Sequence, residues 1–274
     1  MAKPAKVLVY RHKAVTRLTH WVNVLAVSLL LMSGLQIFNA HPALYWGQKT
    51  TFAQPWVSMT AEPRGDKTIG VTKIGSLRLE TTGVFGYSGK AGALEPRGFP
   101  AWTTIPSYRD LAAGRRWHFF LAWLFVINGL VYWIMSLING HTRKDMLPTG
   151  AELAPRKVWH EIVTHAKLQF PRGQEARQYN ILQKGAYLAA TALLLPLMVG
   201  TGLTMSPAFN AAAPWLLDLF GGRQSARTIH FITAALVVAF IVVHLVMVVA
   251  SGTWNNMRSM ITGRYAIDVE GDAK

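Results

Sequence analysis

Residues 227–252 read RTIHFITAALVVAFIVVHLVMVVASG, and no charged residue lies between positions 228 and 250. This apolar run is long enough for a helix of about 20 residues that crosses the hydrocarbon core of a bilayer. It nevertheless contains His230 and His244. At about 100° per residue, their spacing places both imidazoles on nearly the same helix face, about 21 Å apart along the axis. A polar side chain inside a membrane helix needs a partner, so the stretch predicts two ligand sites on one helix.

The composition indicates an integral membrane protein with several spans. The chain has 274 residues, of which 51% are hydrophobic and 15% charged, which is too apolar for an ordinary soluble domain. The net charge of +15 comes from residues outside the apolar runs, where the positive-inside rule and anionic lipid headgroups account for it. We therefore expect contact with membrane lipid and no binding of nucleic acid.

Cysteine is absent from the sequence. This excludes disulfides, thiolate-bound iron–sulfur clusters and covalently attached c-type haem. Histidine is left as the main candidate metal ligand.

The apolar runs predict an all-α membrane protein, a four-helix transmembrane bundle forming one domain over residues 1–274. The expected spans are residues 17–38, 112–139, 185–205 and 227–252. Pro196, Gly200 and Gly202 predict a kink and a close-packing surface in the third span. A surface helix is expected between the third and fourth spans.

The distribution of cations predicts the orientation of the chain. The tail before the first span contains no acid and five cations, Lys3, Lys6, Arg11, Lys13 and Arg17, and the loop between the second and third spans also has an excess of cations. The positive-inside rule therefore places the N-terminus in the cytoplasm, and an even number of spans returns the C-terminus to the same side. We expect a multi-pass protein of the bacterial inner membrane, whose first span is retained because a signal-peptide cleavage site is lacking.

Residues 39–114 are too polar to span and are predicted to be a long periplasmic insertion. Within them, β-branched residues separated by glycines over residues 67–87 favour one or two short strands. Recurring aromatic residues favour a folded cap beside the periplasmic ends of the spans over disorder. Cations outnumber acids in this segment, which predicts docking of an acidic partner surface. These cations are Lys49, Arg64, Lys67, Lys73, Arg78, Lys90, Arg97 and Arg109.

The predicted topology sorts four intramembrane histidines into two level pairs. His20 and His244 lie toward the cytoplasmic side, and His118 and His230 lie just inside the periplasmic ends of their spans. Axial ligation of haem iron needs two facing imidazoles in a helix bundle with an apolar interior. The pattern therefore predicts two b-type haems, with iron bound by His20–His244 and by His118–His230.

Three arginines near these histidines are candidate partners for haem propionates: Arg17, Arg116 and Arg227. A single histidine at a helix end is more often an interfacial side chain that reaches for water. The matched depths of the four favour ligation when they are taken together. The other histidines, His12, His41, His141, His160 and His165, are expected to be solvated surface residues.

Three motifs carry a resemblance to a known family: RLTHW at residues 17–21, RRWH at residues 115–118, and the pair His230 and His244 with 13 residues between them. They resemble the di-haem cytochrome b subunits of nickel-iron hydrogenases and respiratory formate dehydrogenases, within the prokaryotic cytochrome b561-like superfamily. The resemblance covers the four spans, whereas residues 39–114 are longer than the usual family loop. It implies haem ligation by the histidines of spans one, two and four. It also implies that a respiratory quinone exchanges electrons near one haem and a periplasmic partner near the other.

By the same analogy, the quinone is expected beside His20 and His244, with Asn255 and Asn256 as candidate polar partners. Asparagine just after a helix is more commonly a cap or turn residue, and that structural alternative stays open.

The leading hypothesis is a di-haem b-type cytochrome that transfers electrons between the quinone pool and a periplasmic redox partner. The partner would be a molybdopterin oxidoreductase, a hydrogenase-like enzyme or a cytochrome c, and the chain would be its electron-transfer subunit with no catalytic residue of its own. The sequence is compatible with a homo-oligomer. One alternative is a stand-alone quinone-coupled oxidoreductase that acts on a small oxidant such as superoxide. Another alternative is a proton-coupled transporter. The lack of acidic residues in the spans argues against it.

Overall fold

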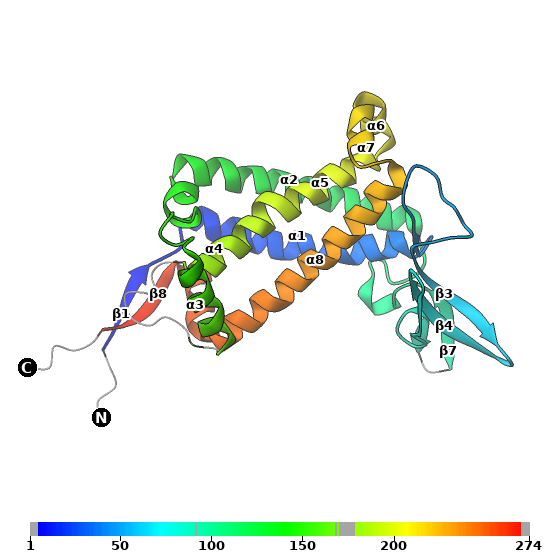
Figure 1. Ribbon diagram of the computed structural model, residues 1–274, viewed down its shortest axis with the longest axis horizontal. Coiled ribbons are helices and arrows are strands. Elements are labelled where there is room, and N and C mark those ends of the chain that lie inside the picture. Colours follow the sequence, from blue (N-terminus) through cyan, green and yellow to red (C-terminus); the bar gives the residue numbers. More distant parts are fainter. Residues whose placement is uncertain (1–4, 91, 168, 170–178, 270–274) are drawn as a thin grey trace, which may run out of the picture. The chain divides into compact units, whose positions relative to one another are not determined.

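The protein is described by a computed structural model over residues 5–90, 92–167, 169 and 179–269 (Figure 1). Three cations that support the predicted orientation fall outside these residues: Lys3 in the N-terminal tail, and Arg172 and Arg177 in the loop between the second and third spans. Four helices among the described residues are long and apolar enough to cross a membrane: Ala14–Phe38, Leu111–Ile138, Ile181–Thr204 and Arg223–Ala250. Each begins and ends within four residues of its predicted position. Helices form here because a backbone in lipid must satisfy its own hydrogen bonds.

The first, second and fourth spans are the continuous helices α1 (Ala14–Phe38), α2 (Leu111–Ile138) and α8 (Arg223–Ala250). The third span is irregular. It consists of α4 (Ile181–Leu188), a π-helical segment η4 (Ala189–Leu194) and α5 (Leu195–Thr204). Pro196 lies two residues after the end of the π segment and cannot donate a backbone hydrogen bond, so the irregularity lies where proline weakens the helix.

The chain forms two compact units, and segments of all four spans belong to each. Unit 1 comprises Met1–Val22, Asn128–Pro196 and Ala235–Lys274, and unit 2 comprises Asn23–Ile127 and Leu197–Ala234. Polar contacts tie the helices together inside unit 1. The Asn128 side chain on α2 donates to the Thr19 carbonyl on α1 at 2.8 Å, and the Trp133 indole donates to the Thr191 carbonyl of the third span at 3.3 Å.

Unit 1 also contains a small sheet made from the two ends of the chain. Strand β1 (Ala5–Tyr10) pairs antiparallel with β8 (Arg264–Val269), and Figure 1 shows the two strands side by side. The pairing brings the segment before α1 beside the segment after α9 (Thr253–Thr262). The remaining elements of unit 1 are the π segment η2 (Thr142–Met146) and α3 (Pro155–Ala166).

Unit 2 includes the polar segment between α1 and α2, which is a small β structure. A sheet of order β2-β3-β4-β5 is formed by Ala43–Leu44, Val57–Arg64, Lys67–Ile74 and Leu77–Glu80. A second ribbon pairs β6 (Gly86–Lys90) with β7 (Ala93–Arg97), and a 3-10 turn η1 (Ala101–Thr103) follows. One or two short strands were predicted over residues 67–87, where the structure has β4, β5 and the start of β6. Strands β2, β3 and β7 were not predicted. Two short helices, α6 (Pro207–Ala212) and α7 (Pro214–Leu219), lie where one was expected.

An aromatic core attaches this β structure to the helix ends. Leu44 and Val57 from the sheet pack with Phe38, the last residue of α1. The Phe38 ring lies 4.7 Å from the ring of Phe231 on α8, measured between centroids. The core of the β structure therefore includes Phe231, the residue that follows the predicted site residue His230.

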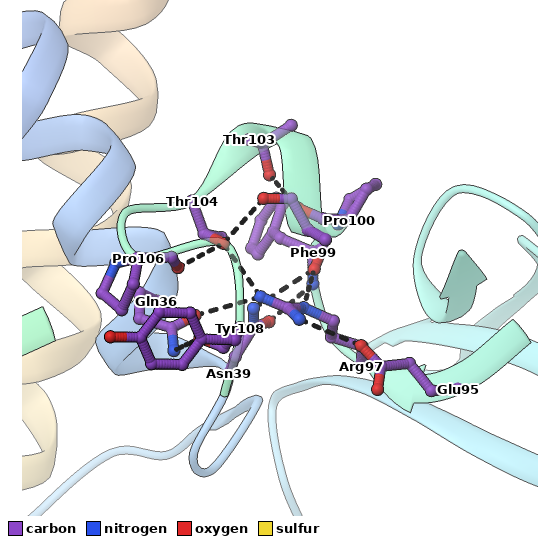
Figure 2. Close-up of polar contacts among 11 residues, drawn as sticks. Gln36, Asn39, Glu95, Arg97, Phe99, Pro100, Thr103, Thr104, Pro106 and Tyr108 are labelled. Atoms are coloured by element: carbon purple, nitrogen blue, oxygen red, sulfur yellow. Dashed lines mark hydrogen bonds and ion pairs between the residues drawn. The ribbon is translucent and has the colours of Figure 1, made fainter. Parts of the chain in front are cut away.

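A buried arginine forms a second attachment, drawn in Figure 2. Arg97, only 3% exposed, ends strand β7. Its guanidinium donates to Gln36 Oε1 on α1 at 3.1 Å, to Thr104 Oγ1 at 2.8 Å and to Glu95 at 2.9 Å, and its Nε donates to the Phe99 carbonyl at 3.0 Å. Four acceptors thus compensate the cost of burying this charge.

The segment just after α1 is also bonded to the first turns of α8. The Arg227 guanidinium donates to the His41 carbonyl at 2.6 Å, and the Thr228 hydroxyl donates to the Tyr45 carbonyl at 2.6 Å. The backbone N–H of Gly47 donates to Ser225 Oγ at 2.7 Å. These contacts fix the start of the polar segment against the end of α8 that carries His230.

A paired carboxylate in unit 1 gives the fold a pH dependence. Glu152 accepts from the Thr149 backbone N–H at 2.8 Å and from Lys184 Nζ at 2.9 Å, and these bonds lower the pKa of Glu152 to about 2. Because the folded pKa lies below the unfolded value, the pair stabilises the fold above about pH 4.5 and loses this effect as pH falls toward 2. We expect Glu152→Gln to lower the melting temperature at neutral pH. The difference from the unsubstituted protein should shrink through that acidic range, and a constant difference would contradict the assignment.

Candidate haem-binding sites

The structure brings the four predicted histidines together in two pairs, one inside each unit. In unit 1, the ring centroids of His20 on α1 and His244 on α8 lie 6.3 Å apart. In unit 2, the ring centroids of His118 on α2 and His230 on α8 also lie 6.3 Å apart. All four side chains are partly buried.

This separation suits one metal ion between two imidazoles. An imidazole nitrogen lies about 2 Å from a transition metal that it binds. With each ring centroid about 1 Å beyond its nitrogen, two rings on opposite sides of one ion have centroids about 6 Å apart. Both pairs therefore have the spacing of a bis-histidine site.

The number of available side chains points to a porphyrin instead of a bare ion. Among the described residues, no group of three or more His, Cys, Asp or Glu side chains is arranged to hold a metal. Each pair can thus supply two ligands only, and a six-coordinate iron would take its other four from a porphyrin ring.

Neighbouring groups orient the imidazoles differently in the two units. In unit 2, His118 Nδ1 is 3.1 Å from Ser33 Oγ, and His230 Nδ1 is 2.9 Å from Thr201 Oγ1. In unit 1, His20 Nδ1 is buried and has no hydrogen-bond partner among the described residues. The Phe240 ring stacks on His244 one helical turn away, with centroids 6.0 Å apart.

Two glycines give the unit 2 rings room to approach other helices. A Cβ atom placed on Gly34 of α1 would lie 3.3 Å from His118 Cε1, and one placed on Gly202 of α5 would lie 3.5 Å from His230 Cε1. Gly202, predicted to allow close packing, thus lies directly against the ring of the site residue His230. Ser33, Gly34 and Thr201 were missed by the sequence analysis. The signal available was a hydroxyl residue followed by glycine within an apolar span, found at residues 33–34 and 201–202.

The three predicted arginines differ in their placement. Arg17 and Arg227 each precede a site histidine by three residues, so they share its helix face. The Arg17 guanidinium donates to the Ile261 carbonyl. Its Nε is buried without a hydrogen-bond partner among the described residues, so this N–H remains available to donate to an anion such as a propionate. Arg116 is exposed and stands about 200° around the helix from His118, which faces it away from the pair. Arg115 occupies the equivalent third position before His118 and packs against the Phe119 ring.

The asparagines considered for quinone have structural partners. The Asn255 side chain donates to the Ala266 carbonyl at 2.8 Å and accepts from its N–H at 2.9 Å. Asn256 donates to Ser251 Oγ at 2.9 Å. These bonds fix α9 against β8 and the end of α8, which supports the structural alternative for both residues.

Of the five histidines expected to be solvated, His160 is exposed, whereas His12, His41, His141 and His165 are partly buried and bonded. His141 Nδ1 lies 2.7 Å from Asp145 Oδ2, and His165 Nδ1 lies 2.9 Å from the Glu161 carbonyl oxygen. His41 Nε2 lies 3.1 Å from the Tyr45 hydroxyl, and His12 Nδ1 lies 3.3 Å from the Tyr179 hydroxyl. Burial lowers the pKa of His12 to about 4, helped by the nearby Arg11 charge, so the ring is neutral at physiological pH.

Facing histidines on apolar helices are the arrangement of a membrane cytochrome of the b type. The family model described as prokaryotic cytochrome b561 matches residues 11–263, so the chain belongs to the prokaryotic cytochrome b561 family. It is a haem-containing electron-transfer protein of a bacterial membrane. This confirms the family suggested by the three sequence motifs.

A relative from Azospira oryzae, provisionally named protein-methionine-sulfoxide reductase subunit YedZ1, is 26% identical over 238 residues. The alignment covers 86% of this chain and 89% of the relative. No solved structure matches the chain.

Proposed function

We propose that this chain carries two b haems, one at each histidine pair, and transfers electrons between quinone and a periplasmic enzyme. The observation that carries the proposal is the equal 6.3 Å separation of the two imidazole pairs, each inside one compact unit. His20 and His244 would hold one haem, and His118 and His230 the other. Bound haem supplies a one-electron carrier at each pair.

The protein's own residues position these carriers. Arg17 and Arg227 lie one turn before a ligand and can neutralise propionate charge. The β structure of unit 2 packs against Phe38 of α1 and Phe231 of α8, the residue that follows His230. With the N-terminus in the cytoplasm, residues 39–114 are periplasmic, and the pair in unit 2 faces the partner. Quinone then exchanges electrons on the side of His20 and His244, in the bacterial inner membrane.

The name of the Azospira oryzae relative suggests the nature of the partner. We infer that the partner is a periplasmic reductase for methionine sulfoxide in proteins, of the molybdopterin class expected from the family resemblance. Reduction of a sulfoxide to a thioether and water consumes two electrons and two protons. Oxidation of a quinol to a quinone releases the same number, so electrons run from quinol to the periplasm.

A direct test uses the purified protein in liposomes with a water-soluble quinol. The bands of reduced b haem should appear on adding the quinol and decay when a methionine sulfoxide reductase catalytic subunit and its substrate are added. Rapid decay with superoxide alone, and none with the reductase, would contradict the proposal and favour a stand-alone oxidoreductase.

The ion pairs of the β structure reduce the number of cations that are available for docking a partner. Several predicted docking cations are already paired with acids on the sheet: Arg64 with Glu80 at 2.8 Å, Lys73 with Glu62 at 3.4 Å, and Arg78 with Glu62. Arg97 is buried, and the side chain of Lys90 is outside those that the structure describes. Lys49, Lys67 and Arg109 are exposed. These three are therefore the best candidates for an acidic partner surface.

Reversing these three charges to Glu should slow electron transfer to the partner severalfold at low ionic strength, because attraction between unlike surfaces speeds association. The effect should fade as salt screens the charges. The measurement is quinol-dependent turnover of the partner, with haem content recorded for each variant. Reversal of the exposed pair Arg156 and Lys157 on α3 serves as the control. Equal turnover of both variants and the parent protein would overturn docking at this surface.

A further inference from the structure

Each imidazole of the unit 2 pair contacts a hydroxyl group on a different helix. Ser33 of α1 lies 3.1 Å from His118 Nδ1, and Thr201 of α5 lies 2.9 Å from His230 Nδ1. Both hydroxyl residues are completely buried, at 0% exposure. Helices α1 and α5 supply no histidine to this pair, yet each contacts one of its two rings.

The direction of these hydrogen bonds follows from the other contacts of the hydroxyls. Ser33 Oγ donates its only proton to the Leu29 carbonyl at 2.8 Å. Thr201 Oγ1 likewise donates to the Leu197 carbonyl at 2.7 Å. With the hydroxyl proton held by that carbonyl, each oxygen can accept from the imidazole, and Nδ1 then carries the ring proton. The backbone carbonyls of Leu30 and Met198 also hydrogen-bond to His118 and His230. In both rings the lone pair then belongs to Nε2, the nitrogen left free for a metal.

The glycines after the two hydroxyl residues complete the arrangement. Gly34 and Gly202 each let the ring edge at Cε1 approach the neighbouring helix, because a Cβ would lie 3.3 Å and 3.5 Å away. The ring is thus constrained by a hydrogen bond at one atom and by backbone packing at the next. His20 in unit 1 differs, since its buried Nδ1 has no hydrogen-bond partner among the described residues.

Resting on the ligation proposed above, we propose that Ser33 and Thr201 are positioning residues that set the tautomers of His118 and His230 and lower the reduction potential of the haem bound there. A ligating imidazole that donates its Nδ1 proton becomes a more basic ligand. A more basic ligand stabilises the oxidised iron more than the reduced iron, and second-shell hydrogen bonds are an established means of tuning haem potentials. Removing either acceptor should therefore raise the potential of that haem alone.

The test compares Thr201→Val with Thr201→Ser by redox titration of the purified protein. Valine keeps the volume of threonine and removes the acceptor, whereas serine keeps the acceptor. We expect Thr201→Val to shift one of two midpoint potentials to more positive values and Thr201→Ser to leave both near the parent values. Ser33→Ala should shift the same potential in the same direction.

Matched controls remove a hydroxyl that bonds only within its own helix. Ser28 Oγ donates to the Val24 carbonyl at 2.7 Å, and Thr191 Oγ1 donates to the Tyr187 carbonyl at 2.8 Å. Ser28→Ala and Thr191→Val should leave both potentials unchanged. Loss of one haem in Thr201→Val but not in Thr201→Ser would also support the proposal, because the acceptor would then be needed to present Nε2.

Three results would overturn the role of the hydroxyls: equal potentials in Thr201→Val and Thr201→Ser, a shift to more negative values, or haem loss in both. A separate experiment tests whether His230 binds haem at all. If it does not, His230→Ala should retain the haem content of the parent protein.

Discussion

The variant His230→Ala should be isolated with one haem per chain fewer than the parent protein. His230 faces His118 in unit 2, and removing it leaves a single protein ligand for an iron that needs two axial imidazoles. The haem at His20 and His244 should remain, because that pair lies inside the other unit. His244→Ala should show the reverse loss. Haem quantified per chain gives the number of haems that each variant has lost. A redox titration then identifies which midpoint potential has disappeared.

His160→Ala is the matched control for these losses, since His160 is exposed on α3. This variant should retain the full haem content of the parent. If both His230→Ala and His244→Ala retained it as well, the assignment of ligands would be wrong.

The second large effect is expected for Arg97→Met. This substitution removes the buried donor to Gln36 Oε1 and Thr104 Oγ1, whereas the Phe99 carbonyl keeps the bond from Asn39 Nδ2 (Figure 2). Unsatisfied buried polar groups each cost about 1–3 kcal/mol, so we expect a loss on the order of 3 kcal/mol from the attachment between β7 and α1. The measurement is the rate at which a protease cuts the segment between α1 and α2, together with the melting temperature.

Arg64→Met provides the comparison, because Arg64 pairs with Glu80 at 2.8 Å on an exposed surface. Exposed ion pairs contribute about 0–1 kcal/mol, so this change should have little effect. Equal protease sensitivity of the two variants would contradict a structural role for the Arg97 contacts.

The spans could be predicted from sequence because lipid leaves a helix as the simplest solution for a long apolar run. The error at the start of the third span has a specific cause. Lys184 lies in the first turn of α4, where it is buried and paired with Glu152, so the apolar run looked shorter than the helix. Asn180 and Gln183 form a capping box at the start of α4. This local signal of a helix start does not appear in a hydropathy pattern.

The β structure was harder to predict because much of its pairing is not local. Strands β1 and β8 lie at opposite ends of the chain, and only the folded helices bring them together. Strand β3 reads as a mixed polar segment, and its burial depends on Phe38 and Phe231 from two helices. Such contacts depend on tertiary packing, which overrides local preference.

The histidine pairing could be predicted because topology assigns each residue a depth in the membrane. The hydroxyl partners could not, because Ser33 and Thr201 resemble ordinary helix residues that bond to their own backbone, which they also do. Helix geometry separates the two arginines before His118, since Arg115 lies three positions away on the same face, whereas Arg116 lies about 200° around the helix.

The measurement that most directly tests the account is a reduced-minus-oxidised absorption spectrum of the purified protein, with haem quantified per chain. Two histidine pairs predict two b-type haems per chain, resolved in a redox titration as two components. A single haem per chain, or a spectrum without b-type bands, would contradict the assignment of both pairs as haem sites.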